Sequence, residues 1–270
     1  MAIDQPLVVA HRGSSHDEPE HTLAAYQRAL DEGVDALECD VRLTRDGHLV
    51  CVHDRRVDRT SSGHGLVSTL ELAELAELDF ASWRLGDERL GDGPSNEAPD
   101  TDEAGVLTFE RLLQMVLEAP KPVGLHVETK HPTRYAGLVE QTLVRLLAEY
   151  GVTGGDAPAA GRVTVMSFAP LGLRRIRLLA PELPTVLLVR DRTYPAWRDG
   201  SLPSGVHIAG PSIGTLRRHP RYVGRLHARG HRAHAWTVDE PADIDLVLEL
   251  GVDAVITNRP SEVLRRLGRV

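Results

Sequence analysis

The sequence is poor in aromatic residues, in cysteine and in long apolar runs. Only 4% of its 270 residues are aromatic, and it has two cysteines, Cys39 and Cys51. Both lie in apolar, strand-like runs, so we expect reduced core thiols and no disulfide framework. No stretch approaches the roughly 20 apolar residues of a membrane-spanning helix, and residues 1–6 lack the basic and apolar segments of a signal peptide. These absences predict a cytoplasmic protein with no membrane span.

The chain also lacks an excess of positive charge. Its formal net charge is −8, with 31 Lys and Arg against 39 Asp and Glu. A nucleic-acid surface needs a concentrated basic stripe, so nucleic acid is not an expected partner. An anionic small molecule would need local cations, because the overall field does not attract it. The hydrophobic fraction of 41% is enough for a sizeable core in one large α/β domain or two small ones.

Short apolar runs alternate with stretches of helical period along most of the chain. Buried strands are predicted at 7–10, 36–41, 123–128, 163–168, 185–189, 206–209, 232–238 and 253–257. Helices are predicted between most of them, at 22–32, 109–119, 135–150, 171–179, 216–228 and 242–250. Repeated strand–helix units indicate parallel strands joined by right-handed crossovers. Eight of them in about 250 residues favour a closed (β/α)8 TIM barrel over an open doubly wound sheet, and 206–209 is the weakest strand.

A hairpin is predicted directly after the second strand. Asp46-Gly47 between alternating segments is a strong signal for a two-residue turn, which would make residues 49–53 run back beside that strand. If Arg45 faces His48, then His53 lies opposite Asp40 on the same face. A bulge would shift this register by one residue.

A long excursion follows the hairpin. It contains a leucine-rich helix at 71–78 and an acidic tract with Gly and Pro at 91–105. Segments of this length inside a compact fold are usually functional or disordered. We expect residues of about 54–105 to be a subdomain inserted into a single domain that spans 1–270.

Acidic residues gather near the ends of predicted strands, where a barrel of this type has its active site. Glu38 and Asp40 are two residues apart, so they point to the same side of their strand, and Glu128 ends the third strand. Carboxylates inside a barrel cannot remain unpaired in a low dielectric. Hard oxygen ligands suit Mg²⁺ or Ca²⁺, whereas Zn²⁺ usually takes His and Cys ligands. The three carboxylates therefore predict a site for a divalent metal ion.

The basic residues around these carboxylates suit phosphodiester hydrolysis. That reaction needs neutralised phosphoryl oxygens, an activated nucleophile and a proton for the leaving alkoxide. A divalent ion together with Arg12 and Lys130 meets the first need. The two imidazoles of His11 and His53 titrate near neutrality and can serve as base and acid.

The same residues carry a family likeness. The blocks in question are His11-Arg12-Gly13, Pro19-Glu20-His21-Thr22, Glu38-Cys39-Asp40-Val41, Val52-His53-Asp54, Glu128-Thr129-Lys130, Ala235-Trp236-Thr237-Val238 and Thr257-Asn258-Arg259-Pro260. In order and spacing they resemble the signature of glycerophosphodiester phosphodiesterases over residues 7–260. The resemblance implies a metal-assisted barrel enzyme that releases sn-glycerol 3-phosphate and an alcohol from small-molecule diesters such as glycerophosphocholine and glycerophosphoethanolamine.

Carried over by position, the resemblance also assigns roles. It makes His11 and His53 the acid–base pair, assigns the metal to Glu38, Asp40 and Glu128, and assigns phosphate contacts to Arg12 and Lys130. Glu20 falls at a site carboxylate position near the metal. His21 stands where the family usually has Asn, which is expected to alter the shape or pH dependence of the site.

Further site residues are predicted from their place on the strands. Trp236 is expected to stack on the glycerol moiety, and Asn258 ends the eighth strand. His126 shares a face with Glu128 and is a candidate contact behind the metal ligands. The other histidines of the C-terminal third are expected mostly at the surface; they are His207, His219, His227, His231 and His234.

Several alternatives stay open at this level. The same barrel could serve a lysophospholipase D or a phospholipase-like lyase, although so few aromatic residues favour small water-soluble diesters. A non-catalytic binding module is a third possibility, but such a protein would typically have lost a histidine or a metal carboxylate. The same residues could direct attack by water or by the substrate's own 2-hydroxyl group. Head-group preference, the choice between Mg²⁺ and Ca²⁺ and the oligomeric state are not determined.

Overall fold

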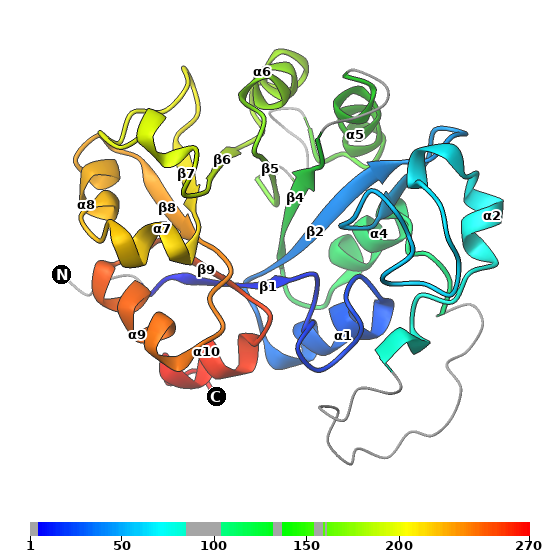
Figure 1. Cartoon of the computed structure of the whole chain (residues 1–270), viewed down its shortest axis with the longest axis horizontal. Coiled ribbons are helices and arrows are strands. Elements are labelled where there is room, and N and C mark those ends of the chain that lie inside the picture. The colour runs from blue at the N-terminus through cyan, green and yellow to red at the C-terminus, as the bar shows by residue number, and fades with distance from the viewer. Residues whose placement is uncertain (1–4, 85–103, 132–136, 154–158, 160) are drawn as a thin grey trace.

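Eight parallel strands form a closed barrel with helices around its outside (Figure 1). The computed structural model describes residues 5–84, 104–131, 137–153, 159 and 161–270. Around the ring the strands are β1 (Leu7–His11), β2 (Ala36–Leu43), β4 (Gly124–Thr129), β5 (Val163–Ser167), β6 (Thr185–Val189), β7 (Ile208–Pro211), β8 (Arg232–Ala235) and β9 (Ala254–Thr257). Pairing of β1 with both β9 and β2 closes the ring. The predicted (β/α)8 barrel is confirmed.

β7 and β8 differ most from their predicted bounds, while β2 continues two residues further, to Leu43, and the other strands agree to within one residue. β7 begins at Ile208, because the chain before it turns, with the N–H of Val206 bound to the carbonyl of Pro203. β8 ends at Ala235 and not at Val238. From Trp236 onward the described pairing is reduced to an isolated bridge to Ser212 and the hydrogen bond from the N–H of Val238 to the carbonyl of Ile256. The weakest predicted strand is nevertheless present, so the ring is complete.

The helices follow the strands as parallel crossovers require. They are α1 (Leu23–Glu32), α4 (Phe109–Glu118), α5 (Leu138–Glu149), α6 (Pro170–Leu179), α7 (Ile213–Arg218), α8 (Tyr222–His227), α9 (Pro241–Leu250) and α10 (Pro260–Arg266), with the short turn η3 (Tyr194–Ala196). The single helix predicted at 216–228 is wrong. Pro220 has no N–H and forces His219 out of helical geometry (φ −135°, ψ 60°), so the segment divides into α7 and α8.

The hairpin after β2 has a different turn from the predicted one. β3 (Leu49–Cys51) runs antiparallel to β2, with Val41 opposite Cys51. The N–H of Thr44 bonds to the carbonyl of His48, which leaves a three-residue loop, 45–47, in which Gly47 takes φ 91°. The predicted register is therefore wrong by one residue, and His53 lies beyond the end of β3.

The excursion after β3 packs on a small apolar cluster of its own. Its described elements are η1 (Val67–Thr69), α2 (Leu72–Ala76) and η2 (Ser82–Arg84). Its buried side chains are Val50, Val52, Val57, Val67, Leu75 and Phe80. The acidic tract at 91–105 lies mostly outside the described residues. The guanidinium of Arg84 donates to the carbonyls of Ser15, His16 and Glu18, which fixes this segment against the loop after β1.

The two faces of each barrel strand have different surroundings. On β2, Leu37, Cys39 and Val41 face the helices and belong to the large outer core. Glu38 and Asp40 face the barrel interior, whose apolar residues include Val9, Ala36, Met166, Val186, Leu188, Ala254 and Ile256. Within the described part of the chain, no helix combines the length and the apolar character that crossing a bilayer requires.

Candidate active site

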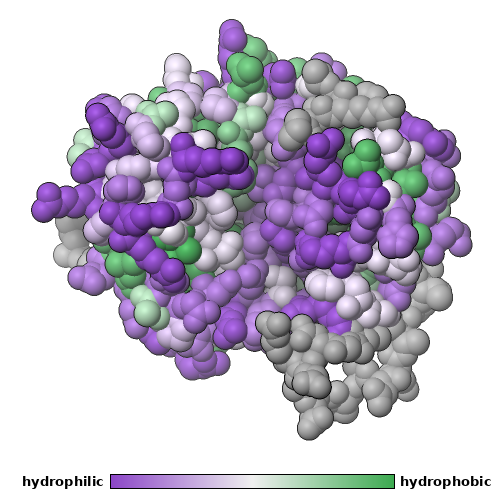
Figure 2. Space-filling view, viewed as in Figure 1, coloured by the Kyte–Doolittle hydropathy of each residue, from purple (hydrophilic) through white to green (hydrophobic). Residues whose placement is uncertain are grey.

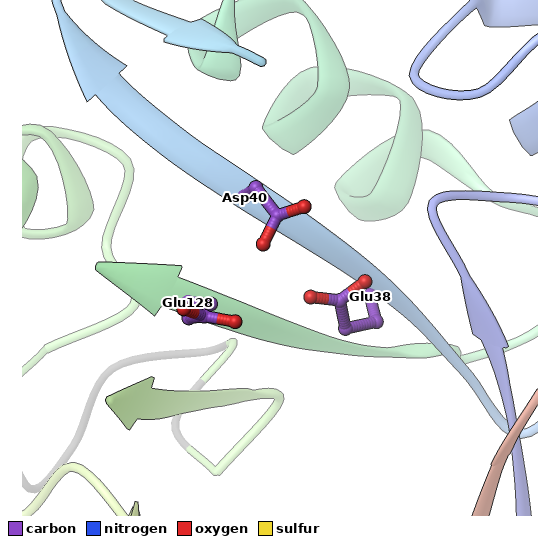
Figure 3. Close-up of side chains that lie close together, drawn as sticks. All are labelled: Glu38, Asp40 and Glu128. Atoms are coloured by element: carbon purple, nitrogen blue, oxygen red, sulfur yellow. The ribbon is translucent and has the colours of Figure 1, made fainter. Parts of the chain in front are cut away.

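Three carboxylates meet inside the barrel near the carboxyl ends of β2 and β4 (Figure 3). Glu38 and Asp40 project from β2, and Glu128 lies beside Asp40 in the register between β2 and β4. One carboxylate oxygen from each residue lies within 4.8 Å of the other two. All three side chains are buried. The structure thus brings together the three predicted metal ligands.

The pKa values of these three carboxyl groups show that burying three negative charges here is unfavourable without a cation. Burial and the neighbouring charge of Asp40 raise the pKa of Glu38 well above its usual range and that of Glu128 to about 7. Burial also works against the charge on Asp40, but Lys130 and Arg12 hold its pKa well below the usual range. A divalent ion would stabilise the ionised form of all three groups. Hard oxygen donors at this spacing fit Mg²⁺ or Ca²⁺.

Arg12 and Lys130 contact the same carboxylates. Lys130 Nζ lies 2.8 Å from Asp40 Oδ1 and 2.9 Å from Glu128 Oε2. Although burial opposes its charge, Asp40 and Glu128 raise the pKa of Lys130, which therefore stays protonated. Arg12 Nε lies 3.0 Å from Asp40 Oδ2. Both predicted phosphate contacts thus lie at the carboxylate cluster.

The loop after β1 holds Arg12 in an unusual backbone conformation. Arg12 (φ 60°) and His21 (φ 62°) are the two non-glycine residues with positive φ in the described part of the chain, a conformation that clusters at functional sites. The two residues are joined by a backbone hydrogen bond, in which the N–H of His21 donates to the carbonyl of Arg12. At Gly13 (φ 83°) a Cβ atom would lie 2.6 Å from a backbone carbon of Ala25, so the loop packs directly on α1.

The imidazole of His11 is held in one tautomer. Asn258 Nδ2 donates to Asp239 Oδ2 (2.7 Å), so the amide oxygen of Asn258 is the atom that faces His11 Nδ1 (2.7 Å). That oxygen can only accept, so Nδ1 carries the proton and Nε2 keeps its lone pair. Burial and the charge of Arg12 lower the pKa of His11 to about 3, and the ring is neutral at pH 7.

His53 is oriented by a carboxylate. Its Nδ1 lies 2.8 Å from Asp54 Oδ1, and each side chain is 34% exposed. Asp54 Oδ2 in turn accepts from Arg59 Nε (2.6 Å). Because an ionised carboxylate only accepts, His53 donates from Nδ1 and leaves Nε2 free. Burial lowers the pKa of His53, while Asp54 and Asp40 act in the opposite direction.

Both imidazoles line one cavity of about 540 Å³ at this end of the barrel. Glu128, Arg12 and Lys130 line it as well. Trp236 forms part of the wall, in edge-to-face contact with Phe168 (5.3 Å between ring centroids), and its indole N–H donates to the carbonyl of Gly210. The cavity is of the size that small-molecule sites occupy.

Three other predicted site residues lie elsewhere around the site. Glu20 is not part of the carboxylate cluster: Arg12 and Arg59 bind it, and although burial opposes ionisation they lower its pKa to about 2. His21 is buried behind the cluster, with Nε2 3.1 Å from Asp40 Oδ2 and Nδ1 2.8 Å from the hydroxyl of Tyr26.

His126 points into the barrel below the cluster and stacks on His234, with 5.3 Å between ring centroids. No hydrogen bond to a metal carboxylate is present in the described residues. The predicted surface position of His234 is therefore wrong, since its side chain is buried in the interior. The alternation of side chains along β8 indicates this buried position, because His234 and Trp236 are two residues apart and share a face.

Sequence reasoning missed several residues of the cavity. They are Arg42, Asp54, Arg55, Thr129, His131, Phe168, Arg190 and Thr237. Most could have been found from position alone. Arg42 follows Asp40 by two on the same strand face, and Phe168 and Arg190 come directly after β5 and β6, at the end of the barrel where active sites lie. Asp239, which orients Asn258, had no such signal.

A closed barrel with buried carboxylates, fixed imidazoles and cations at the carboxyl ends of its strands has the groups that hydrolysis of a phosphoric ester requires. The model of the glycerophosphoryl diester phosphodiesterase family matches residues 11–262. The chain belongs to this family and is a phosphoric diester hydrolase, which confirms the resemblance seen in the sequence.

Relatives agree over nearly the whole chain. It is 47% identical over 255 residues to the probable glycerophosphodiester phosphodiesterase 1 of Mycobacterium tuberculosis, covering 94% of this chain and 90% of the relative. It is 33% identical over 263 residues to a glycerophosphodiester phosphodiesterase of Bacillus subtilis, covering 96% and 86%. A solved phosphodiesterase of Oleispira antarctica, in complex with its product sn-glycerol-3-phosphate, matches with a TM-score of 0.78 at 24% identity over 97% of both chains. That last likeness shows the fold alone.

Proposed function

We propose that this chain hydrolyses glycerophosphodiesters, such as glycerophosphocholine and glycerophosphoethanolamine, to sn-glycerol 3-phosphate and an alcohol. The reaction depends on a divalent ion, Mg²⁺ or Ca²⁺, held by Glu38, Asp40 and Glu128. One observation carries the proposal: two imidazoles, each with its Nδ1 hydrogen-bonded, line the same cavity as Glu128 of the carboxylate cluster, and His11 Nε2 lies 3.9 Å from Glu38 Oε2.

The binding of the phosphodiester follows from the charges around the cluster. Arg12 and Lys130 are fixed by their carboxylate partners, so they meet the phosphoryl oxygens without having to be ordered first. A bound divalent ion supplies further positive charge at these oxygens. Trp236 offers an apolar wall beside them, on which the glycerol carbons would pack. These contacts would hold the phosphodiester in the cavity that both imidazoles line.

The partners of the two imidazoles suggest different roles. His11 has a neutral amide on Nδ1 and a neighbouring guanidinium, so it favours the neutral form and acts as the base at Nε2. His53 has the carboxylate of Asp54 on Nδ1, which stabilises the imidazolium, so it acts as the acid. An anionic phosphate bound beside both rings offsets the lowering of their pKa by burial. His11 takes the proton of the attacking oxygen, and His53 returns one to the leaving alcohol.

The attacking oxygen belongs either to water or to the 2-hydroxyl of the glycerol moiety. In the second route the first product is a cyclic glycerol phosphate, which water then opens. A His53→Ala or His11→Ala variant that accumulates the cyclic phosphate would decide for the second route. Release of sn-glycerol 3-phosphate with no cyclic species at any time would decide for the first.

The proposed activity is tested with chelator-treated protein and glycerophosphocholine, with sn-glycerol 3-phosphate as the readout and with Mg²⁺ or Ca²⁺ added back. We expect release only with metal, and at least a hundredfold less of it with His11→Ala. His227→Ala is the matched control, because His227 lies on α8 and pairs with Asp253, outside the cavity. No release with either metal from choline, ethanolamine or glycerol head groups would contradict the proposal.

The alternative functions have less support. Membership of a hydrolase family removes the non-catalytic binding module. A lysolipid would need an apolar groove for its acyl chain, whereas Phe168 and Trp236 are the only large apolar side chains among the described residues that line the cavity. Figure 2 shows hydrophobic residues on the face in view only as small separate groups. The two free, buried cysteines accord with the cytoplasm as the proposed compartment.

A further inference from the structure

The cavity contains more positive charge than its carboxylates balance. Arg12, Lys130 and Arg59 each have carboxylate partners within 3.1 Å. Arg42, Arg55 and Arg190 also line the cavity, and no carboxylate of the described residues lies within 4.0 Å of their guanidinium nitrogens. The chain as a whole is acidic, with a net charge of −8. Three arginines at one cavity with no carboxylate partner among the described residues are therefore a local feature.

The guanidinium of Arg42 has a neutral hydrogen-bond partner. Its Nε and Nη2 both donate to the backbone carbonyl of His53, at 3.0 and 2.6 Å. A half-buried guanidinium with a neutral partner gains from an anion brought by a ligand.

Arg190 covers an aromatic face in the wall of the cavity. Its guanidinium carbon lies 3.8 Å from the ring centroid of Phe168, so it stacks on that aromatic ring. A trimethylammonium group seeks an aromatic face of this kind, and here a like charge already covers it. The indole N–H of Trp236 is bound to Gly210, so it has no free donor for the head group. This wall disfavours choline and leaves a guanidinium to contact the alcohol.

The three arginines lie on two sides of the cavity. Arg42 and Arg55 come from β2 and from the chain just after β3, and Arg190 follows β6. The phosphodiester itself carries one negative charge, which Arg12, Lys130 and the metal ion meet. The remaining arginines are thus available to the part of the substrate that leaves.

We propose that the preferred substrates are glycerophosphodiesters whose alcohol carries its own negative charge, a carboxylate or a phosphate. This inference rests on the proposed function and names its substrate class. Choline and ethanolamine diesters are then turned over less efficiently. The preference comes from charge at the rim of a hydrated cavity, so it weakens as ionic strength rises.

The test compares substrates that differ in one group. Glycerophosphoserine and glycerophosphoethanolamine differ by a carboxylate, and glycerophosphoinositol 4-phosphate and glycerophosphoinositol differ by a phosphate. We expect kcat/KM to be about tenfold higher for the anionic member of at least one pair, mainly through KM. The two pairs distinguish a carboxylate from a phosphate as the recognised group.

Variants assign the preference to the arginines. The Arg55→Gln/Arg190→Gln double variant should lower the ratio of kcat/KM for the anionic substrate to kcat/KM for its partner substrate at least fivefold. The two single variants show how much of this loss each arginine accounts for. The control is Arg174→Gln/Arg232→Gln, which removes the same charge from exposed positions on α6 and at the start of β8. Both substrates of a pair are measured on the same preparation, so the ratio does not depend on how much of a variant is folded.

The outcomes separate this inference from the proposed function. Hydrolysis of every diester with a ratio near or below one overturns the anionic preference and leaves the activity standing. A high ratio that the double variant does not change overturns the role of Arg55 and Arg190. No hydrolysis of any diester removes the proposed function, and this inference with it.

Discussion

The carboxylate of Asp54 is expected to decide the tautomer of His53, and Asp54→Asn tests this. The carboxylate serves two donors, Arg59 Nε at 2.6 Å and His53 Nδ1 at 2.8 Å. Asparagine offers one oxygen in place of two. Arg59 is always a donor, so the amide oxygen turns to it and the amide N–H₂ faces His53. That side chain must then accept at Nδ1 and carry its proton on Nε2.

The size of the effect follows from the hydrogen bond that is lost. Hydrogen bonds to charged groups contribute about 1.5–3 kcal/mol. His53 and Asp54 are each 34% exposed, so solvent screening places this one at the lower end, about 1.5 kcal/mol. A barrier higher by that amount is about a tenfold loss of kcat. The wrong tautomer adds to the loss, so we expect at least a tenfold decrease in kcat with a small change in KM.

Two measurements check this expectation. Steady-state release of sn-glycerol 3-phosphate gives kcat and KM, with Asp199→Asn as a control that removes an equally charged but exposed carboxylate paired with Arg229. Nitrogen-15 spectra of histidine-labelled protein report which ring nitrogen is protonated, and a His53→Asn spectrum assigns the signal. If Asp54→Asn keeps more than half of the wild-type kcat, or if His53 keeps its proton on Nδ1, the reasoning is refuted.

Three further expectations concern the metal site, the loop after β1 and the barrel interior. Because the pKa of Glu128 is about 7, a proton competes with the metal ion, and calorimetry should show about tenfold weaker Mg²⁺ or Ca²⁺ binding at pH 6 than at pH 8; equal affinities would contradict this. Gly13→Ala should lower the free energy of unfolding by at least about 2 kcal/mol, against about 1 kcal/mol for Gly33→Ala, which has a similar φ but no atom within 4 Å of the new Cβ; equal losses in urea titrations would remove the steric cause. Burial lowers the pKa of His126 to about 4, so the unfolded state binds more protons between pH 6.5 and 4, and this ring should contribute about 3 kcal/mol to the loss of stability as pH decreases through that window. Other rings with a lowered pKa, such as His11, add to the loss. His126→Leu should therefore reduce the loss by about 3 kcal/mol in urea titrations, and an unchanged slope would contradict this.

The sequence was sufficient for the barrel because the information it needs is local. Each strand is a short apolar run, and the connection of a strand to a helix fixes the parallel order. The prediction of one helix at 216–228 was wrong for an equally local reason. Pro220 interrupts the helix, although the apolar residues on both sides of it follow a helical period. The bounds of β7 and β8 depended instead on where neighbouring strands stop pairing, which no single segment encodes.

The sequence predicted those site residues that lie on or directly after barrel strands. His53 lines the cavity, but its predicted position opposite Asp40 is wrong: the assumed two-residue turn is a three-residue loop, so His53 and Asp40 are not a cross-strand pair. His53 enters the cavity because Arg42 binds its carbonyl and Asp54 binds its ring. The partners that fix the tautomers, Asp54 and Asp239, are contacts between loops, and periodicity does not report them.

His21 shows how a departure from a motif can be accommodated by the structure around it. The position has φ 62°, a conformation that asparagine and histidine both adopt more readily than most residues. The imidazole reaches Asp40 with Nε2 and the Tyr26 hydroxyl with Nδ1, and that hydroxyl also lies 3.1 Å from the carbonyl of Glu38. One buried ring and one phenol thus connect the two metal-site residues of β2 from behind. Because His21 does not line the cavity, its replacement of asparagine changes what supports Asp40 and not what contacts the substrate.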